Sequence, residues 1–185
     1  MKLRRAAQAA AVAVVVALLG VLIWDVAHSP GGKVAKEVDS GHSFPAPLFT
    51  RSLVEGGGTL SLKSLRGKVV VLNFWESYCP PCVAEARTMA AASRQWRGKD
   101  VVFLGVDFQD LPGPAQKFIK RFDITYPNVS DDGPLVGHYG VTGFPETFFI
   151  DKQGVVVPAV PGGHIVGGAT MKTLTTGIRN ALRGE

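Results

Sequence analysis

The sequence predicts an α/β domain with a mixed central sheet flanked by helices, preceded by one transmembrane helix. Three observations predict this fold class. Residues 6–24 form a long apolar run, and a β-branched strand leads directly into a Cys-x-x-Cys pair at the start of a helix. The remainder alternates short apolar strands with helical patterns. At 185 residues the chain has room for one ordinary domain and a short attachment.

The N-terminal region is expected to attach the domain to the cell membrane as a single-pass protein. The predicted parts are a cytoplasmic N-terminus at 1–5, a transmembrane anchor at 6–24, a flexible tether at 25–43 and the folded domain at 44–185. The anchor is uncharged, and its nineteen residues would span roughly 28 Å as a helix, about the hydrocarbon thickness of a bilayer. Lys2, Arg4 and Arg5 precede it and should stay cytoplasmic, which places the domain outside the cytoplasm.

Two alternatives stay open for the apolar run. A signal peptide would be cleaved after small residues, and 27–29 is the nearest such pattern, but Pro30 follows it directly and would hinder processing. A buried helix of a soluble protein is the second alternative, and the length and lack of charge argue against it.

The charges of the chain give no support for nucleic-acid binding. The net charge is +5, from 20 basic and 15 acidic residues. These residues are mixed along the chain without a basic run, which is typical of an ordinary solvated surface.

The first half of the folded domain is expected to hold a hairpin, two buried strands and one long helix. Residues 48–50 and 59–61 flank a triple-glycine turn and suggest the hairpin. The runs 69–74 and 101–106 are apolar apart from Asn73 and rich in β-branched residues, as buried parallel strands require. Between them a helix is predicted over 80–97, with an apolar inner stripe and a glycine stop.

The second half is expected to continue with helices and a strand pair. A helix is predicted at 114–122, because three of its apolar residues share one face, followed by a short strand at 124–129 and a short helix at 135–139. Strands at 146–150 and 154–160 flank a polar turn, and an amphipathic helix at 171–182 closes the domain.

The two cysteines of the chain carry the predicted chemistry. Cys79 and Cys82 stand at the expected helix start, where free N–H groups and a partial positive charge favour thiolate over thiol. The thiolate is the attacking species in disulfide exchange. We expect Cys79 to be the exposed nucleophile and Cys82, one turn further, to be shielded and to resolve the mixed disulfide. The redox-active disulfide then needs no cofactor and no metal.

Other interpretations of the pair are weaker. A structural zinc site needs four ligands, and the chain has no second cysteine pair. Covalent haem attachment needs histidine where Val83 stands. A purely structural disulfide closing so short a loop would restrain little of the unfolded chain.

The residues between the cysteines predict a reductant. Pro80 and Pro81 lack backbone N–H groups that otherwise reach the Cys79 sulfur. Fewer donors stabilise the reduced thiolate less, and each 1.4 kcal/mol lost shifts the potential by about 30 mV toward reducing.

Four motifs resemble one known family. They are Val69–Trp75, the Cys79-Pro-Pro-Cys82 pair, Gly105-Val-Asp107 and Gly143–Asp151. In order and spacing they resemble the TlpA/ResA/DsbE (CcmG) group of extracytoplasmic thioredoxin-like thiol–disulfide oxidoreductases, over roughly residues 44–183. The resemblance implies a thioredoxin-like fold with an inserted βα unit, for which residues 101–122 leave room.

The resemblance also implies roles for further residues. Pro145 would be a cis-proline facing the disulfide, with the Phe144 backbone pairing with substrate; a plain strand-initiating proline is the alternative. Glu85 would relay the proton of Cys82, since Asn73 stands where ordinary thioredoxins carry a buried Asp. A stabilising acid in the first helical turns is the alternative for Glu85.

The remaining implied site residues form the substrate-binding surface. Glu146 would help to dock a basic partner, or would be an ordinary exposed acid at a strand start. Trp75 and Tyr78, with Pro80 and Pro81, would line the surface beside the disulfide. The family often has Trp at the position of Tyr78, which leaves the substrate preference open.

The partners implied by the resemblance are protein disulfides, with apocytochrome c first among them, and a membrane electron carrier that re-reduces the enzyme. A general reductase or oxidase of exported proteins is the alternative. A copper-binding chaperone of related fold, using both cysteines and His138, is an alternative of another class. His28 and His42 fall in the predicted tether, and His164 stands isolated in the sequence.

Overall fold

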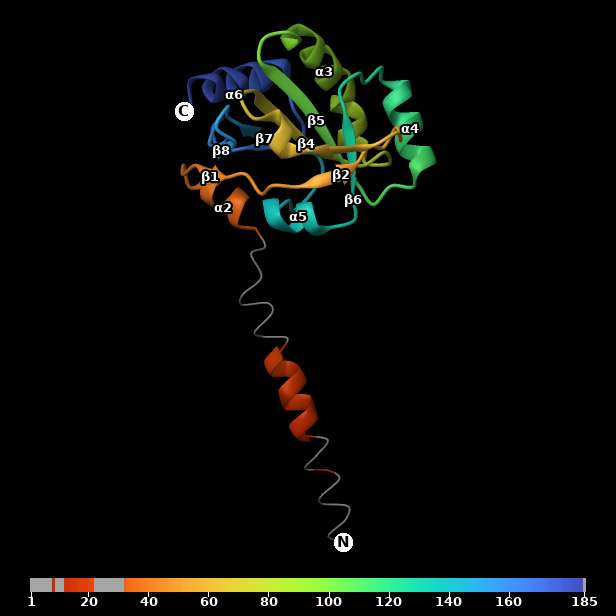
Figure 1. Ribbon diagram of the computed structural model, residues 1–185, viewed down its shortest axis with the longest axis vertical. Helices are drawn as coiled ribbons and strands as arrows, with labels where there is room; N and C mark the ends of the chain where they lie inside the picture. The colour runs from red at the N-terminus through yellow and green to blue at the C-terminus, as the bar shows by residue number, and fades with distance from the viewer. Residues whose placement is uncertain (1–7, 9–11, 22–31, 185) are drawn as a thin grey trace. The chain divides into compact units, whose positions relative to one another are not determined.

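The computed structural model describes residues 8, 12–21 and 32–184 (Figure 1). The chain divides into two units, Met1–Pro30 and Gly31–Glu185. In the first unit, residues 12–21 are helical. Among the described residues, no helix combines the length and the apolar character that crossing a bilayer demands. Eight of the nineteen residues of the anchor predicted at 6–24 lie outside this description, and the anchor stays a prediction.

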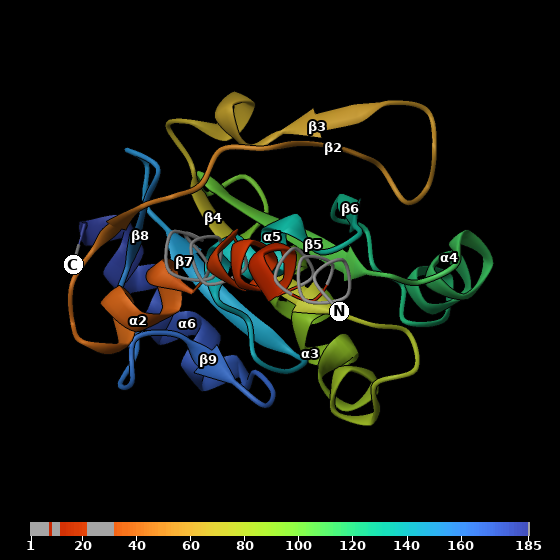
Figure 2. The same ribbon diagram turned by 90° about the horizontal axis from the view of Figure 1, so that it is seen from below.

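The second unit is built on a mixed sheet, as predicted. Its strands lie in the order β1-β8-β7-β4-β5-β6, with β9 also paired to β7. The bounds are β1 Phe44–Pro45, β4 Val69–Trp75, β5 Val101–Phe108, β6 Asn128–Asp131, β7 Glu146–Ile150, β8 Val155–Val157 and β9 Ile165–Val166. The β4, β5 and β6 strands are parallel, whereas β7 runs antiparallel to β4, β8 and β9. A separate hairpin of β2 (Thr50–Ser52) and β3 (Thr59–Ser61) runs along one side of the molecule (Figure 2).

Helices cover both faces of the sheet (Figure 1). They are α2 Lys33–Asp39, α3 Pro80–Trp96, α4 Pro112–Arg121, α5 Pro134–Tyr139 and α6 Met171–Arg183, and a 3₁₀ turn occupies Leu62–Leu65. The packing of the β4 strand shows why its residues are apolar, apart from Asn73. Val69 and Val71 belong to the core under α3 and α6, while Val70, Leu72 and Phe74 belong to the core under α2 and α5. A strand covered on both faces has no solvent side on which polar residues are favoured.

The short helix α2 corrects one prediction. Residues 25–43 were expected to be a flexible tether, yet Lys33–Asp39 is helical, with Val34 and Val38 fully buried. The Gly32 N–H donates to the Gly137 carbonyl at 2.8 Å, which joins the start of α2 to α5. Seven residues are too few to show a helical period, and their apolar side is recognisable only once its partners are in place. Residues 25–31 lie outside the described part.

Two strand predictions also need correction. The strand expected at 124–129 begins only at Asn128, because Ile124 and Tyr126 are buried in irregular backbone ahead of Pro127. The alternation of these buried residues with exposed ones resembles a strand pattern, but no strand of the described part pairs with them. The strand expected at 154–160 ends at Val157, since Pro158 has no N–H to offer a neighbour. The expected βα unit over residues 101–122 is present as β5 and α4.

Candidate functional site

The β4 strand delivers the cysteine pair to the start of α3. The strand ends at Trp75, a short loop follows, and Cys79 is the N-cap of α3, with prolines in the first helical positions. Cys79 and Cys82 form a disulfide. The Cys82 N–H donates to Cys79 Sγ at 3.2 Å. Cys79 is 8% exposed and Cys82 is 1% exposed, so Cys79 is the more accessible of the two, as expected. Pro80 and Pro81 are both exposed beside it.

The loop before β7 lies against the disulfide. The Phe144–Pro145 peptide bond is cis, as the family resemblance implied. The carbonyl oxygen of Phe144 lies 3.4 Å from Cys79 Sγ, so a protein segment approaching this sulfur must pass the same loop. The Phe144 ring stacks on Phe108 of β5, with ring centroids 5.1 Å apart. Phe108 is a contact that the sequence did not suggest.

Glu85 is a buried carboxyl group one turn beyond Cys82. The two residues are three positions apart on α3, so their side chains share a face of the helix. Glu85 is 5% exposed, and it accepts hydrogen bonds from Asn73 Nδ2 at 2.9 Å and from the Ala169 N–H at 2.5 Å. Burial raises the pKa of Glu85 above its usual range, although both hydrogen bonds act in the opposite direction. Glu85 therefore keeps its proton to higher pH than an exposed glutamate does.

Glu85→Gln is expected to slow disulfide exchange near neutral pH by about tenfold or more, because the variant keeps the shape but cannot take a proton. Stopped-flow measurement of the exchange rate between pH 5 and 9 tests this. Glu37→Gln, at an acid on α2 that lies beside the exposed His42, serves as the control. An unchanged pH–rate profile in Glu85→Gln would remove the proton-relay role.

Glu146 is buried, so the exposed position considered for it is wrong. Its side chain is 2% exposed. One carboxylate oxygen, Oε1, accepts hydrogen bonds from the Thr142 N–H at 3.0 Å, the Thr142 hydroxyl at 3.1 Å and the Gly143 N–H at 3.1 Å. The other oxygen lies 3.1 Å from His164 Nε2. Although burial acts to raise the pKa of Glu146, these partners together lower it. The carboxylate therefore organises the loop before Pro145 from the inside.

The two predicted aromatic residues occupy different environments. Trp75 is 2% exposed, stacks on Phe118 with centroids 4.5 Å apart, and donates from Nε1 to Asn128 Oδ1 at 3.2 Å. Tyr78 is 65% exposed directly before Cys79. Tyr78 can therefore meet a substrate, whereas Trp75 supports the site from within the core.

An acidic pair below the loop was not predicted. Asp110 Oδ2 accepts from the Ser77 N–H at 2.7 Å and so holds the loop that leads into Cys79. Asp107, near the end of β5, is 2% exposed, and its Oδ1 and that of Asp110 are buried without a hydrogen-bond partner among the described residues. Burial, with the nearby charge of Asp110, raises the pKa of Asp107 to about 8. The Gly105-Val-Asp107 motif was the signal available in the sequence.

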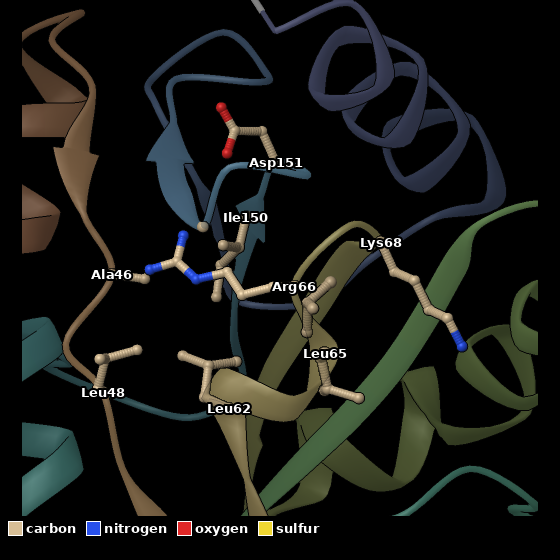
Figure 3. Close-up of a pocket in the computed structure, with 10 residues that line it drawn as sticks. Ala46, Leu48, Leu62, Leu65, Arg66, Lys68, Ile150 and Asp151 are labelled. Carbon is tan, nitrogen blue, oxygen red and sulfur yellow. The ribbon is translucent and has the colours of Figure 1, made fainter.

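The small hollow shown in Figure 3 is not part of this site. It has a volume of about 10 Å³, room for one water molecule at most. It is lined by Ala46, Leu62, Val70 and Ile150, with the Arg66 side chain stretched across it. Val70 is near the start of β4 and pairs with Ile150, so the hollow is at the other end of β4 from Cys79.

Among the described residues, no group of three or more His, Cys, Asp or Glu is arranged to hold a metal ion, and His138 is exposed on α5.

Known proteins resemble the chain in sequence and in fold. The AhpC/TSA family model matches residues 43–159. Thiol-disulfide oxidoreductase ResA of Bacillus cereus is 35% identical over 118 residues, which cover 63% of this chain and 68% of that protein. Thiol:disulfide interchange protein DsbE of Pseudomonas fluorescens biotype C is 36% identical over 114 residues, covering 60% and 62%.

Solved structures agree with these relatives. A thiol:disulfide interchange protein of the thioredoxin family from Chlorobium tepidum superposes with a TM-score of 0.68 at 28% identity, covering 76% of this chain and 97% of that one. A secreted Mycobacterium tuberculosis disulfide oxidoreductase, described as homologous to DsbE, gives 0.60 at 25% identity, covering 71% and 94%. The chain therefore belongs to the AhpC/TSA family and is a thiol-disulfide oxidoreductase of the ResA/DsbE type with a thioredoxin-like fold.

Proposed function

We propose that this protein is a membrane-anchored reductant of protein disulfides that works outside the cytoplasm. The direction of the reaction is supported by the start of α3, where the Cys79 sulfur has fewer N–H donors than usual. An N-cap side chain ordinarily accepts hydrogen bonds from the N–H groups of the second and third helical residues. Here Cys82, the third residue, donates to Cys79 Sγ, but Pro81, the second residue, has no N–H. The reduced thiolate is stabilised less, which favours giving electrons away.

The reaction proceeds in two exchanges. The Cys79 thiolate attacks one sulfur of the substrate disulfide, forming a mixed disulfide and releasing the other substrate sulfur as a thiolate. Cys82 then loses its proton to Glu85, and its thiolate attacks Cys79 Sγ. The second substrate thiolate leaves, and Cys79–Cys82 is oxidised. Two electrons pass to the substrate, whose thiolates take up two protons.

The substrate we propose is the Cys-x-x-Cys-His segment of an apocytochrome c, whose cysteines must be reduced before haem attachment. The support is the likeness to ResA- and DsbE-type proteins. The exposed surface around the disulfide supports a protein substrate, because Tyr78 is exposed and the Phe144 carbonyl is beside the reacting sulfur. A membrane electron carrier returns the enzyme to its dithiol form. The anchor at residues 6–24 and the basic residues before it support this location.

The reduction potential tests the proposal. We expect a value closer to thioredoxin, roughly −270 mV, than to the strong oxidant DsbA, roughly −120 mV. Pro81→Ala should raise the potential by about 30 mV, because the restored N–H contributes about 1.4 kcal/mol to the thiolate. Equilibration of the purified protein with glutathione or dithiothreitol buffers measures both values.

Pro80→Ala is the matched control for this titration. Both prolines were expected to remove a donor, but only the N–H groups of the second and third helical residues reach an N-cap side chain. Pro80→Ala restores an N–H at the first helical position, so its potential should stay near that of the parent. A potential of the unchanged protein near −120 mV would refute the reductant and favour an oxidase of exported proteins.

A further inference from the structure

His164 joins two carboxylates that are far apart in the sequence. Its ring is buried and stacks on Phe148, with centroids 4.3 Å apart and an interplanar angle of 5°. Nδ1 lies 2.7 Å from Asp39 Oδ1 on α2, and Nε2 lies 3.1 Å from Glu146 Oε2 on β7. The residue was considered isolated in the sequence, since its partners are 125 and 18 positions away.

The geometry determines how many protons the ring carries. A neutral imidazole has one N–H donor and one acceptor nitrogen, whereas an ionised carboxylate only accepts. Glu146 is ionised, because the hydrogen bonds from His164 and Thr142 together outweigh burial and lower its pKa. Asp39 is exposed on α2, and its Oδ1 faces the other ring nitrogen at 2.7 Å as a hydrogen-bond acceptor. Both ring nitrogens must then donate, so His164 is an imidazolium held between two negative charges.

The bridge ends at the loop beside the disulfide. Glu146 Oε1 holds the N–H groups of Thr142 and Gly143, and Phe144, the next residue, places its carbonyl against Cys79 Sγ. The Gly167 N–H, three residues after His164, donates to the Pro145 carbonyl at 3.0 Å. The segment around His164 is therefore joined to the cis-proline loop twice, through Glu146 and through the Gly167 N–H.

We propose that His164 is a positioning residue for protein substrates. Its imidazolium ties α2, through Asp39, to Glu146, and so holds the loop of residues 142–145 in the conformation that receives a substrate segment. The inference rests on the proposed role of that loop in binding a protein disulfide. The new element is the positive charge of His164, which substrate binding requires. Through Asp39, the helix α2, which follows the N-terminal segment, supports the substrate site.

The charge has a defined dependence on pH. Burial acts to lower the pKa of His164, but Glu146 and Asp39, the charged groups that face it from β7 and α2, together raise it above its ordinary value. Because the folded pKa is raised, the bridge is fully present below the ordinary histidine pKa and is lost as pH rises through the folded value. Glu146 has a lowered pKa, so its part of the bridge is lost only toward acid.

The first test measures the ring directly. Nitrogen-15 NMR of the full chain in detergent should show both ring nitrogens of His164 protonated at pH 7. In Asp39→Asn the titration of the ring should move to clearly lower pH, because one of the two negative charges is gone. Glu37→Gln, also on α2, should leave it in place. A single neutral tautomer at pH 7 in the parent protein would overturn the inference whatever the substrate is.

The second test separates binding from chemistry with a disulfide-containing Cys-x-x-Cys-His peptide. His164→Gln should raise KM about tenfold while kcat changes less than twofold, and Asp39→Asn should raise KM about threefold. In the parent protein KM should rise with pH through the His164 titration.

If the parent reduces the peptide but both variants keep its KM, the positioning role is wrong. If the parent fails to reduce the peptide while it still exchanges with dithiothreitol, the proposed substrate is wrong, and the NMR result decides the bridge separately. If His164→Gln fails to fold, Asp39→Asn, a substitution at an exposed position, still tests the proposal.

Discussion

Cys82→Ser is expected to accumulate stable mixed disulfides with its partners, whereas Cys79→Ser should form none. Cys79 is the N-cap of α3 and lies beside the Phe144 carbonyl, while Cys82 is 1% exposed behind it. Removal of the resolving sulfur stops the reaction after the first exchange, and removal of the attacking sulfur prevents that exchange. Turnover should fall on the order of 10³-fold or more in both variants.

Non-reducing gel electrophoresis of whole cells, followed by mass spectrometry of the captured proteins, measures this difference. The Cys79→Ser/Cys82→Ser double variant is the control for non-specific association. Equal capture by both single variants would contradict the order of attack. Capture of apocytochromes c by Cys82→Ser would support the proposed substrate, whereas capture of unrelated exported proteins alone would favour a general reductase.

Asp107→Asn is expected to stabilise the protein above pH 8 by a few kcal/mol. Asp107 Oδ1 and Asp110 Oδ1 are buried, and neither has a conventional hydrogen-bond donor among the residues that the structure describes. Two neighbouring buried carboxyl groups are more stable when they share one proton, and burial, with the charge of Asp110, raises the pKa of Asp107 to about 8. An asparagine amide supplies a permanent N–H donor to Asp110 without an ionisable group.

The sign of the pH effect follows from linkage. The folded pKa of Asp107 is above its unfolded value of 3.8, so between about pH 4 and pH 8 the folded state binds more protons than the unfolded state. Stability contributed by this group therefore falls as pH rises through that window. Each tenfold difference in proton affinity between the two states corresponds to about 1.4 kcal/mol of stability. The shift from 3.8 to about 8 therefore sets an upper bound, and relaxation of the buried pair reduces the effect to a few kcal/mol.

Urea unfolding of the oxidised protein at pH 5, 7 and 9 measures the dependence. The parent protein should lose stability across this range, and Asp107→Asn should lose much less. Asp132→Asn, at an exposed acid near the same pair, serves as the control and should keep the slope of the parent. If Asp107→Asn kept that slope as well, the shared proton would be refuted.

The redox pair was predictable because its chemistry is local. Cys79 before two prolines and an apolar stripe specifies a helix start, and a helix start is enough to favour a reactive thiolate. The β4 and β5 strands were predictable for a similar reason, because a continuous β-branched run fits only a strand covered on both faces. Glu85 shares a face of α3 with Cys82, so simple helical spacing brings them together.

The burial of Glu146 and the partners of His164 could not be obtained this way. An acid after a proline at a strand start has the same local pattern whether it faces solvent or the core. Its environment is decided by Thr142, Gly143 and His164, and the last of these comes from the turn before β9. Trp75 was likewise expected at the surface, yet its Nε1 donates to Asn128, 53 positions away, inside the core.

The sequence by itself determined the reactive sulfurs, the helix that activates them and the central strands, since each depends on neighbours within a few residues. The tertiary structure alone decided which charges are buried and paired: Asp107 with Asp110 below the active-site loop, and Asp39 with His164 and Glu146 behind the cis-proline. The physical reason is that the free energy of a charged group depends on which distant atoms replace its water, and only folding brings those atoms into place.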